Sequence, residues 1–270
     1  MLTSIALYLA LGCFVGILSG LLGIGGGVIV VPILLYCLPL QGIAGHLNLL
    51  ALGTSMASVA FTSFVSARVH NRRKTILWPV VFCLSPGVVA GTLLGGFIAV
   101  LLPGELLSAI FVVFLFYVAC QMLLDIAPKP SRRLPGTAGL AGVGVGIGFF
   151  SSFVGIGGGT VIIPFLTLCN VPLREAVATS TGTGFPIALA GSAIYLIQGW
   201  GVADLPPHSL GFIYLPALLG LVGASMLTAP LGAKLAYRVS VPRLKRLFAL
   251  FLCCISAHLL YTIIKTTFMV

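Results

Sequence analysis

The sequence has very little charge, and almost none of it is negative. Only four residues are Asp or Glu, and charged residues make up 7% of the chain. Soluble domains carry roughly 25% charged residues, so this composition excludes a soluble domain. Hydrophobic residues account for 59% of the sequence and the mean hydropathy is +1.21. These values predict that a lipid bilayer surrounds most of the protein.

The seven cysteines do not have the spacing of a metal or redox site. The sequence contains no CxxC pair and no cysteine–histidine cluster, and each cysteine lies within or at the end of an apolar segment. This pattern is typical of small packing residues. We therefore expect no metal site and no cofactor.

Motifs of intramembrane enzymes are also missing from the sequence. It has no H-E-x-x-H, no G-x-S-x-G nucleophile turn and no paired Asp residues. Its glycine clusters lack the preceding strand pattern and the downstream acidic residue of a dinucleotide-binding site. The sequence therefore predicts that the protein is not an enzyme.

What the sequence does contain is one apolar unit that occurs twice. Residues 16–34 read GILSGLLGIGGGVIVVPIL, and residues 148–166 read GFFSSFVGIGGGTVIIPFL. We interpret the chain as a single membrane domain, 1–270, made by duplication. Repeat one is predicted at 1–126 and repeat two at 136–270, joined by a basic loop at 127–135.

Gly, Pro and charged residues divide each half into five apolar segments. A helix needs about 20 residues to cross a bilayer, so the third, fourth and fifth segments of each half are long enough and the second is too short. An alternative count gives eight helices, with each short segment taken as part of a loop. The predicted segments are 3–22, 27–38, 45–66, 77–101 and 104–125, followed by 137–154, 159–169, 173–197, 209–234 and 241–265.

The distribution of Lys and Arg predicts the topology in a cytoplasmic (inner) membrane. Basic residues gather in loops 67–76, 126–136 and 234–246, which the positive-inside rule places in the cytoplasm. The connections near Glu105 and Asp204 have no Lys or Arg and are predicted outside. These loops explain most of the net charge of +10, so we expect no nucleic-acid partner.

Counting crossings from these loops predicts the fold class. Residues 137–172 must enter and leave from the cytoplasm as a hairpin, whereas residues 3–40 form a hairpin that opens outside. We therefore predict a multi-pass, all-α integral membrane protein of two inverted repeats, each with a glycine-tipped helical hairpin plus three full transmembrane helices. This is a common plan among transporters.

The pattern GxLSGLxGIGGGxxxVP in the first copy, with its second copy, resembles the sulfite exporter TauE/SafE family, also called 4-toluenesulfonate uptake permeases. Both copies keep the Gly-Ile-Gly-Gly-Gly core and a downstream proline, Pro32 or Pro164. The resemblance covers the whole chain. It implies transport of a small sulfur-containing anion, such as sulfite, thiosulfate or an organosulfonate, across the cytoplasmic membrane.

The two glycine clusters are the main candidates for substrate binding. Consecutive glycines break a helix and allow positive φ angles, and the helix that follows directs unpaired amides and its positive dipole end at the tip. Such a tip can hold an anion without a buried cation. Close helix packing is the alternative, and we expect it for the ladders at Gly12, Gly16 and Gly20 and at Gly87, Gly91 and Gly95. The candidate glycines are Gly23, Gly25, Gly26, Gly27, Gly155, Gly157, Gly158 and Gly159.

Hydroxyl groups follow both hairpins at equivalent positions. Thr54 and Ser55 lie in the first half, and Thr179 and Ser180 in the second. These side chains could donate to the oxygens of a bound anion or bond back to their own helix carbonyls. We include all four as candidate substrate-binding residues.

The histidines offer no clear coupling site. His70 and His208 are predicted to lie in solvated loops, and no buried carboxylate is expected to pair with a histidine. The sequence therefore predicts a secondary transporter or exporter that works by alternating access. The alternatives are a membrane scaffold or assembly subunit without transport, and a carrier of another small organic anion.

Overall fold

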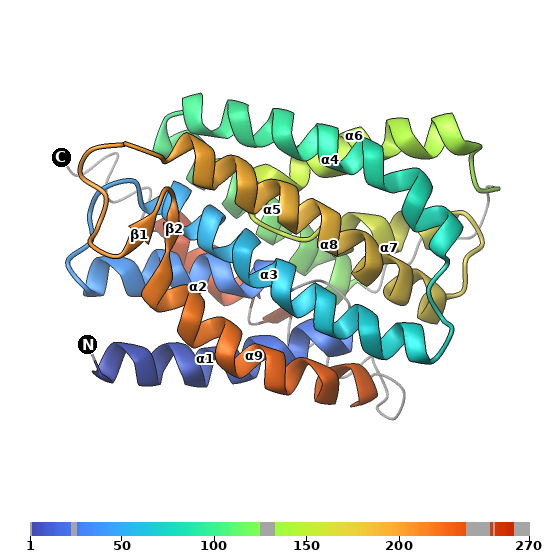
Figure 1. Ribbon diagram of the computed structural model, residues 1–270, viewed down its shortest axis with the longest axis horizontal. Coiled ribbons are helices and arrows are strands. Elements are labelled where there is room, and N and C mark those ends of the chain that lie inside the picture. Colours follow the sequence, from blue (N-terminus) through green and yellow to red (C-terminus); the bar gives the residue numbers. More distant parts are fainter. Residues whose placement is uncertain (1, 23–25, 125–132, 236–248, 251, 262–270) are drawn as a thin grey trace.

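The computed structural model describes residues 2–22, 26–124, 133–235, 249–250 and 252–261. These residues form mostly helices that run roughly along one long axis (Figure 1). The first half contains α1 (Leu2–Leu22), α2 (Gly27–Leu40), α3 (Leu47–Arg72), α4 (Trp78–Leu101) and α5 (Gly104–Leu123). The second half contains α6 (Thr137–Val154), α7 (Gly159–Leu168), α8 (Leu173–Gln198) and α9 (Leu215–Leu235), and a further apolar helix spans Leu252–Tyr261.

Six described helices are long and apolar enough to cross a membrane: α3, α4, α5, α6, α8 and α9. The prediction of an all-α integral membrane protein is thus confirmed. The helices α2 and α7, with 14 and 10 residues, are short, as expected. The helix α6, which was predicted as the first arm of a hairpin, has 18 residues and is also long enough to span.

The predicted segment 209–234 is wrong at its start. Two short antiparallel strands, β1 (Ser209–Leu210) and β2 (Ile213–Tyr214), precede α9. Gly211 lies between them with a φ of +53°, a left-handed conformation that suits a tight turn. Apolar composition alone did not distinguish this hairpin from a helical turn.

Helices α3 and α8 form the centre of the bundle and pack against each other. They are rich in Ser, Thr and Gly, and α3 is the most deeply buried of the six long helices. The helix α5 is more apolar and more exposed. Polar side chains are therefore concentrated inside the bundle, whereas apolar side chains face outward, as expected in lipid.

The most extensive helix contacts join the two halves of the chain. The helix α1 packs along α9, and α6 packs along α4. Glycine allows both approaches: a β-carbon on Gly12 would lie 2.7 Å from the Leu221 carbonyl oxygen, and one on Gly87 would collide with the Ala141 carbonyl oxygen. The prediction that the two glycine ladders serve packing is confirmed at these positions.

The bundle has two chemically different ends. Figure 1 places the α3–α4 connection, the start of α6 and the end of α9 at one end, which we name the basic end. Its described cations are Arg68, Arg72, Arg73, Lys74, Arg133, Arg174 and Lys234. The start of α1 and the strands β1 and β2 lie at the opposite end, which we name the strand end. The helices α1 and α6, the first arms of the two hairpins, begin at opposite ends (Figure 1).

Candidate functional site

The two short helices begin in the same unusual way. Gly26 precedes α2 with a φ of +75°, and Gly158 precedes α7 with a φ of +73°. Both are the fourth residue of a Gly-Ile-Gly-Gly-Gly cluster. A side chain at either position would be strained, because L-residues rarely adopt this conformation. The repeated glycines thus produce repeated geometry, in which a left-handed residue leads into a helix.

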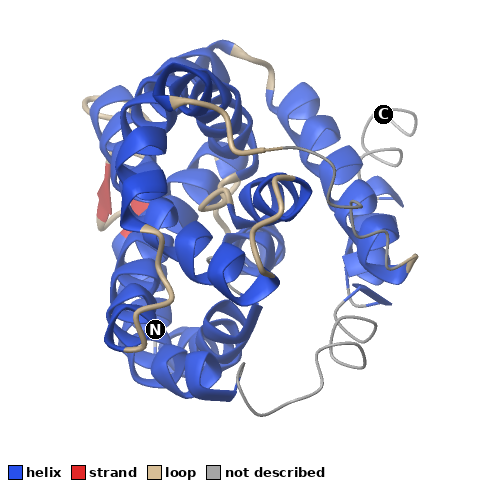
Figure 2. Ribbon diagram, turned by 90° about the vertical axis from the view of Figure 1, so that its right-hand side faces the viewer, coloured by secondary structure: helices blue, strands red, loops and turns tan. Residues whose placement is uncertain are grey.

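The two glycine tips meet inside the bundle. A β-carbon on Gly27 would collide with the carbonyl oxygen of Gly155 and lie 2.9 Å from the Cα atom of Ile156. Viewed from the basic end, short loop segments are enclosed by helices (Figure 2). The structure therefore brings together the described candidates Gly26, Gly27, Gly155, Gly157, Gly158 and Gly159. The candidates Gly23 and Gly25 lie outside the described residues.

The start of α7 presents polar groups that other described residues leave unsatisfied. The amides of Val161 and Ile162 donate to the Gly158 carbonyl, but among the described residues the amides of Gly159 and Thr160 have no acceptor. The Thr160 hydroxyl beside them is also buried and has no described partner. The combination of amides, hydroxyl and helix dipole favours an anion at this position. We did not single out Thr160 from the sequence, although its place in the first turn after the glycines was a usable signal.

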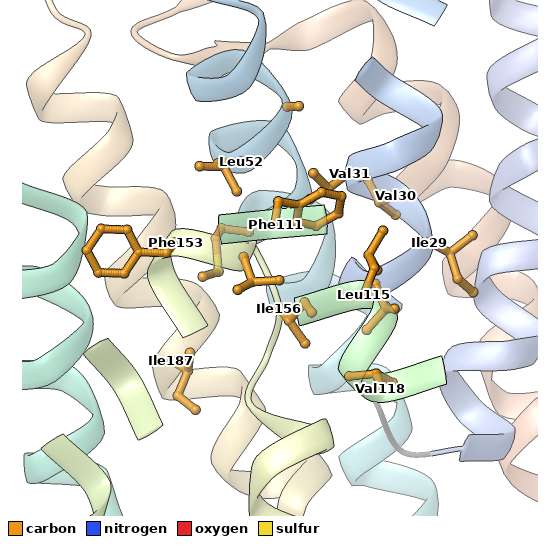
Figure 3. Close-up of a cluster of buried hydrophobic side chains, with 14 of the residues drawn as sticks. Ile29, Val30, Val31, Leu52, Phe111, Leu115, Val118, Phe153, Ile156 and Ile187 are labelled. Carbon is orange, nitrogen blue, oxygen red and sulfur yellow. The ribbon is translucent and has the colours of Figure 1, made fainter. Parts of the chain in front are cut away.

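Apolar side chains cover the tips in this conformation. A β-carbon on Gly155 would contact Val31 and Leu52, and one on Gly158 would contact Ile187. Figure 3 shows Val31, Leu52 and Ile156 in one apolar cluster with Phe111 and Leu115 of α5. The tips are thus closed off by packing. An anion can pass these apolar side chains only if some of the helices move apart.

The four candidate hydroxyls are all buried, and they have different partners. Ser55 donates to the Gly155 carbonyl at 2.7 Å and so holds the second tip from the opposite half of the chain. Ser180 donates to the Val177 carbonyl of its own helix at 3.0 Å, which is the alternative given above for these hydroxyls.

Thr54 and Thr179 act in a way that neither alternative anticipated. The Thr54 hydroxyl accepts from the Tyr214 amide just before α9, at 2.9 Å. The Thr179 hydroxyl accepts from the Leu77 amide just before α4, at 3.0 Å. Each threonine therefore fixes the start of a helix in the other half. The two bonds occupy equivalent positions after the two hairpins, a symmetry that sequence spacing could not reveal.

His70 is buried, and the prediction that it lies in a solvated loop is wrong. Helix α3 extends to Arg72, beyond the predicted end at residue 66, so the His70 side chain lies on the buried face of that helix and is 1% exposed. Helix continuation through a basic segment is the physical reason for the error.

A polar cluster at the strand end was also missed. Gln41 donates to the Tyr8 hydroxyl at 2.6 Å, and the Tyr214 hydroxyl donates to the Gln41 side-chain oxygen at 3.5 Å. The cluster joins α1, the end of α2 and β2. No spacing rule links these three residues in the sequence.

No metal-binding group is present in the part of the chain that the structure describes, where no three His, Cys, Asp or Glu side chains come together. The tip geometry instead offers neutral donors. Such donors suit a small anion that stays solvated by hydrogen bonds inside a protein.

Comparison with known proteins gives the family. Residues 8–259 match the sulfite exporter TauE/SafE family. The chain belongs to this family. It is 36% identical over 262 residues to a probable membrane transporter protein of Haemophilus influenzae, covering 96% of this chain and 99% of that one. A probable membrane transporter protein of Methanocaldococcus jannaschii is 30% identical over 244 residues, 88% of this chain and 89% of the relative. No solved structure matches the chain.

These matches identify a membrane transporter that is multi-pass and embedded in lipid. They extend over nearly the whole chain, so the glycine tips, the central pair α3 and α8, and the cross-half helix contacts all lie within the matched region. The resemblance noted in the sequence is confirmed at the level of the family.

Proposed function

We propose that the protein is a secondary transporter of a small sulfur-containing anion, such as sulfite, thiosulfate or an organosulfonate, across the cytoplasmic membrane. The observation that carries this proposal is the meeting of the two glycine tips at the start of α7, where Gly159 and Thr160 are buried and their amides have no acceptor among the described residues. Buried amides without acceptors are unfavourable, and an anion that accepts from them removes that cost.

The charge balance of the site favours a small anion of low charge. Each helix N-terminus acts as roughly half a positive charge, so two converging N-termini supply about one. The described tip residues contain no Lys or Arg, so a highly charged ligand would lack compensation. A singly charged oxyanion such as bisulfite or an organosulfonate with one sulfonate group fits this balance better than a dianion such as thiosulfate. The family description, sulfite exporter, supports the same class of substrate.

We propose that the two halves are inverted repeats, 1–126 and 136–270. Three observations support this arrangement: α1 and α6 begin at opposite ends of the bundle, α1 packs on α9 as α6 packs on α4, and Thr54 and Thr179 make equivalent bonds. The basic end is proposed to face the cytoplasm, since it collects the described Lys and Arg residues.

Alternating access follows from the closed tips. The central site is sealed by apolar packing, so transport needs motion that opens one end at a time. The helix pairs α1–α9 and α4–α6 have the most extensive contacts, so in this proposal each pair moves as a unit. In this proposal the protein breaks no covalent bond and is not an enzyme.

Counterflow in proteoliposomes tests this function. Purified protein is loaded with unlabelled sulfite, thiosulfate, sulfoacetate or a non-sulfur organic acid, and uptake of the labelled partner is followed. We expect exchange with at least one sulfur anion. Exchange only with the organic acid would indicate a carrier of another anion, and absence of both exchange and binding would favour a scaffold.

A further inference from the structure

One face of α3 carries a row of buried polar side chains, of which the proposed site uses only Ser55. At 3.6 residues per turn these positions share an arc of about 140°, and the row from residue 55 to residue 70 is about 22 Å long. Every member is at most 1% exposed. The row consists of Ser55, Ser58, Thr62, Ser63, Ser66 and His70.

Three hydroxyls of this row lack partners. The oxygens of Ser58, Ser63 and Ser66 are buried and make no hydrogen bond with any described residue. Thr62 differs, because its hydroxyl bonds back to the carbonyls of Ser58 and Val59 at 3.2 Å. Serine in a helix can satisfy itself in this way, so the three unpaired groups are not a necessary result of helical serine. Buried polar groups without partners are characteristic of sites that hold water or a ligand.

The row begins at the second glycine tip. A β-carbon on Gly184 would lie 3.2 Å from the Ser63 hydroxyl and 3.0 Å from the Gly157 carbonyl oxygen, so these two groups flank the same glycine of α8. From there the row continues through Ser66 to His70, one turn before the exposed cations at the end of α3. The row thus connects the tips with the basic end.

The equivalent face of α8 carries only the first two hydroxyls of such a row. If Thr179 is matched with Thr54, Ser55 and Ser58 correspond to Ser180 and Thr183, whose hydroxyls bond to carbonyls of their own helix. The positions that correspond to 62, 63, 66 and 70 are Ile187, Ala188, Gly191 and Tyr195. These residues lead from the tips toward the strand end, and the Tyr195 hydroxyl is satisfied by the Ser152 carbonyl at 2.8 Å. The two halves thus differ in the chemistry of this face from the position of Thr62 onward.

We propose that the buried hydroxyl face of α3 lines a hydrated path between the glycine tips and the basic end, along which a small oxyanion exchanges water for hydroxyl donors. The matching face of α8 has no hydroxyl at the positions that correspond to 62, 63 and 66. The proposal deepens the proposed function, since it names the route by which the same anion site communicates with the basic end.

Cysteine accessibility tests the path without reference to any substrate. In a variant whose seven native cysteines are replaced, Ser63→Cys and Ser66→Cys are each exposed, in inside-out vesicles, to methanethiosulfonate ethylsulfonate, a small impermeant anion. Ala188→Cys, at the α8 position matching Ser63, is the matched control, and the exposed Arg73→Cys confirms that the reagent reaches correctly inserted protein.

We expect both serine positions to react at least about tenfold faster than Ala188→Cys, since a dry packed position excludes a charged reagent. Equal rates at positions 63, 66 and 188, with Arg73→Cys fully labelled, would overturn the proposal. If labelling follows the expectation while counterflow finds no sulfur anion exchanged, the path stands and the substrate assignment fails.

A second measurement covers the case in which a cysteine disturbs packing. The double variant Ser63→Ala with Ser66→Ala removes two unpaired hydroxyls and is not expected to destabilise the fold. We expect it to slow exchange at least about tenfold at saturating substrate, whereas Ser85→Ala in α4, outside the row and with its hydroxyl already bonded to the Val81 carbonyl at 2.7 Å, leaves the rate near that of the parent. Equal rates in the two variants would contradict the path.

Discussion

Replacing Gly27 by alanine adds a single methyl group at the point where the two tips touch. The new β-carbon would collide with the Gly155 carbonyl oxygen and lie 2.9 Å from the Ile156 Cα atom, whereas ordinary contact starts near 3.4 Å. The tips must therefore separate by at least about half an ångström. Both opposing atoms belong to the backbone, so no side-chain rotation relieves the clash.

The size of the effect follows from this overlap. Overpacking a close contact typically costs about 1–3 kcal/mol, which corresponds to about 5- to 150-fold in an equilibrium or a rate. We expect Gly27→Ala to lower the counterflow rate by a factor in this range, because the conformation in which the tips meet is part of every transport cycle. The amount of protein inserted in the membrane should change little.

Gly146→Ala is the matched control for this substitution. Gly146 lies in α6, and a β-carbon there would meet nothing within 4 Å, so the same chemical change should leave transport unaffected. The assay is counterflow in proteoliposomes, normalised to reconstituted protein. If Gly27→Ala exchanges anion as fast as Gly146→Ala, the contact between the tips has no role in transport and the reasoning is refuted.

Four further substitutions test other parts of the site. Gly158→Leu places a side chain at a φ of +73° and against Ile187, so uptake should be lost while the protein still inserts in the membrane. Normal uptake would contradict a role of the Gly158 conformation in transport. Thr54→Val and Thr179→Val each remove the acceptor of a helix-start amide. Each should lower the free energy of unfolding by about 1 kcal/mol, measured as a lower unfolding temperature in detergent. An unchanged temperature would mean that these hydrogen bonds between the halves do not stabilise the fold. Ser55→Ala leaves the second tip without its donor and should reduce exchange about fivefold, and an unchanged rate would show that the tip holds its position without Ser55.

The sequence predicted the helices well, because of a simple rule: a helix that crosses lipid needs about 20 consecutive apolar residues. Apolar length located every long helix, and the glycines at 26 and 158 located the starts of the two short ones. The rule failed where composition stays apolar but the backbone turns, as at Gly211 between β1 and β2. It also failed at His70, where a helix continued into a basic segment.

The candidate site was predicted in part. Consecutive glycines identified the tips, because few other roles tolerate such a run in a membrane helix. Their contact across the bundle depends on how two distant segments pack, and sequence spacing has no information about it. The same limit applies to Thr54 and Thr179, whose partners at Tyr214 and Leu77 lie in the opposite half. Hydroxyl chemistry could be predicted at these positions, but their hydrogen-bond partners could not.

The most direct test of the central claim is to locate the anion itself. Crystals of the protein grown with selenite, the selenium analogue of sulfite, allow the ligand to be found by its anomalous scattering. We expect a selenium peak inside the bundle, within hydrogen-bonding reach of the first-turn amides of α7 and next to the start of α2. A peak confined to the basic end, or no internal peak at concentrations that saturate transport, would contradict the account.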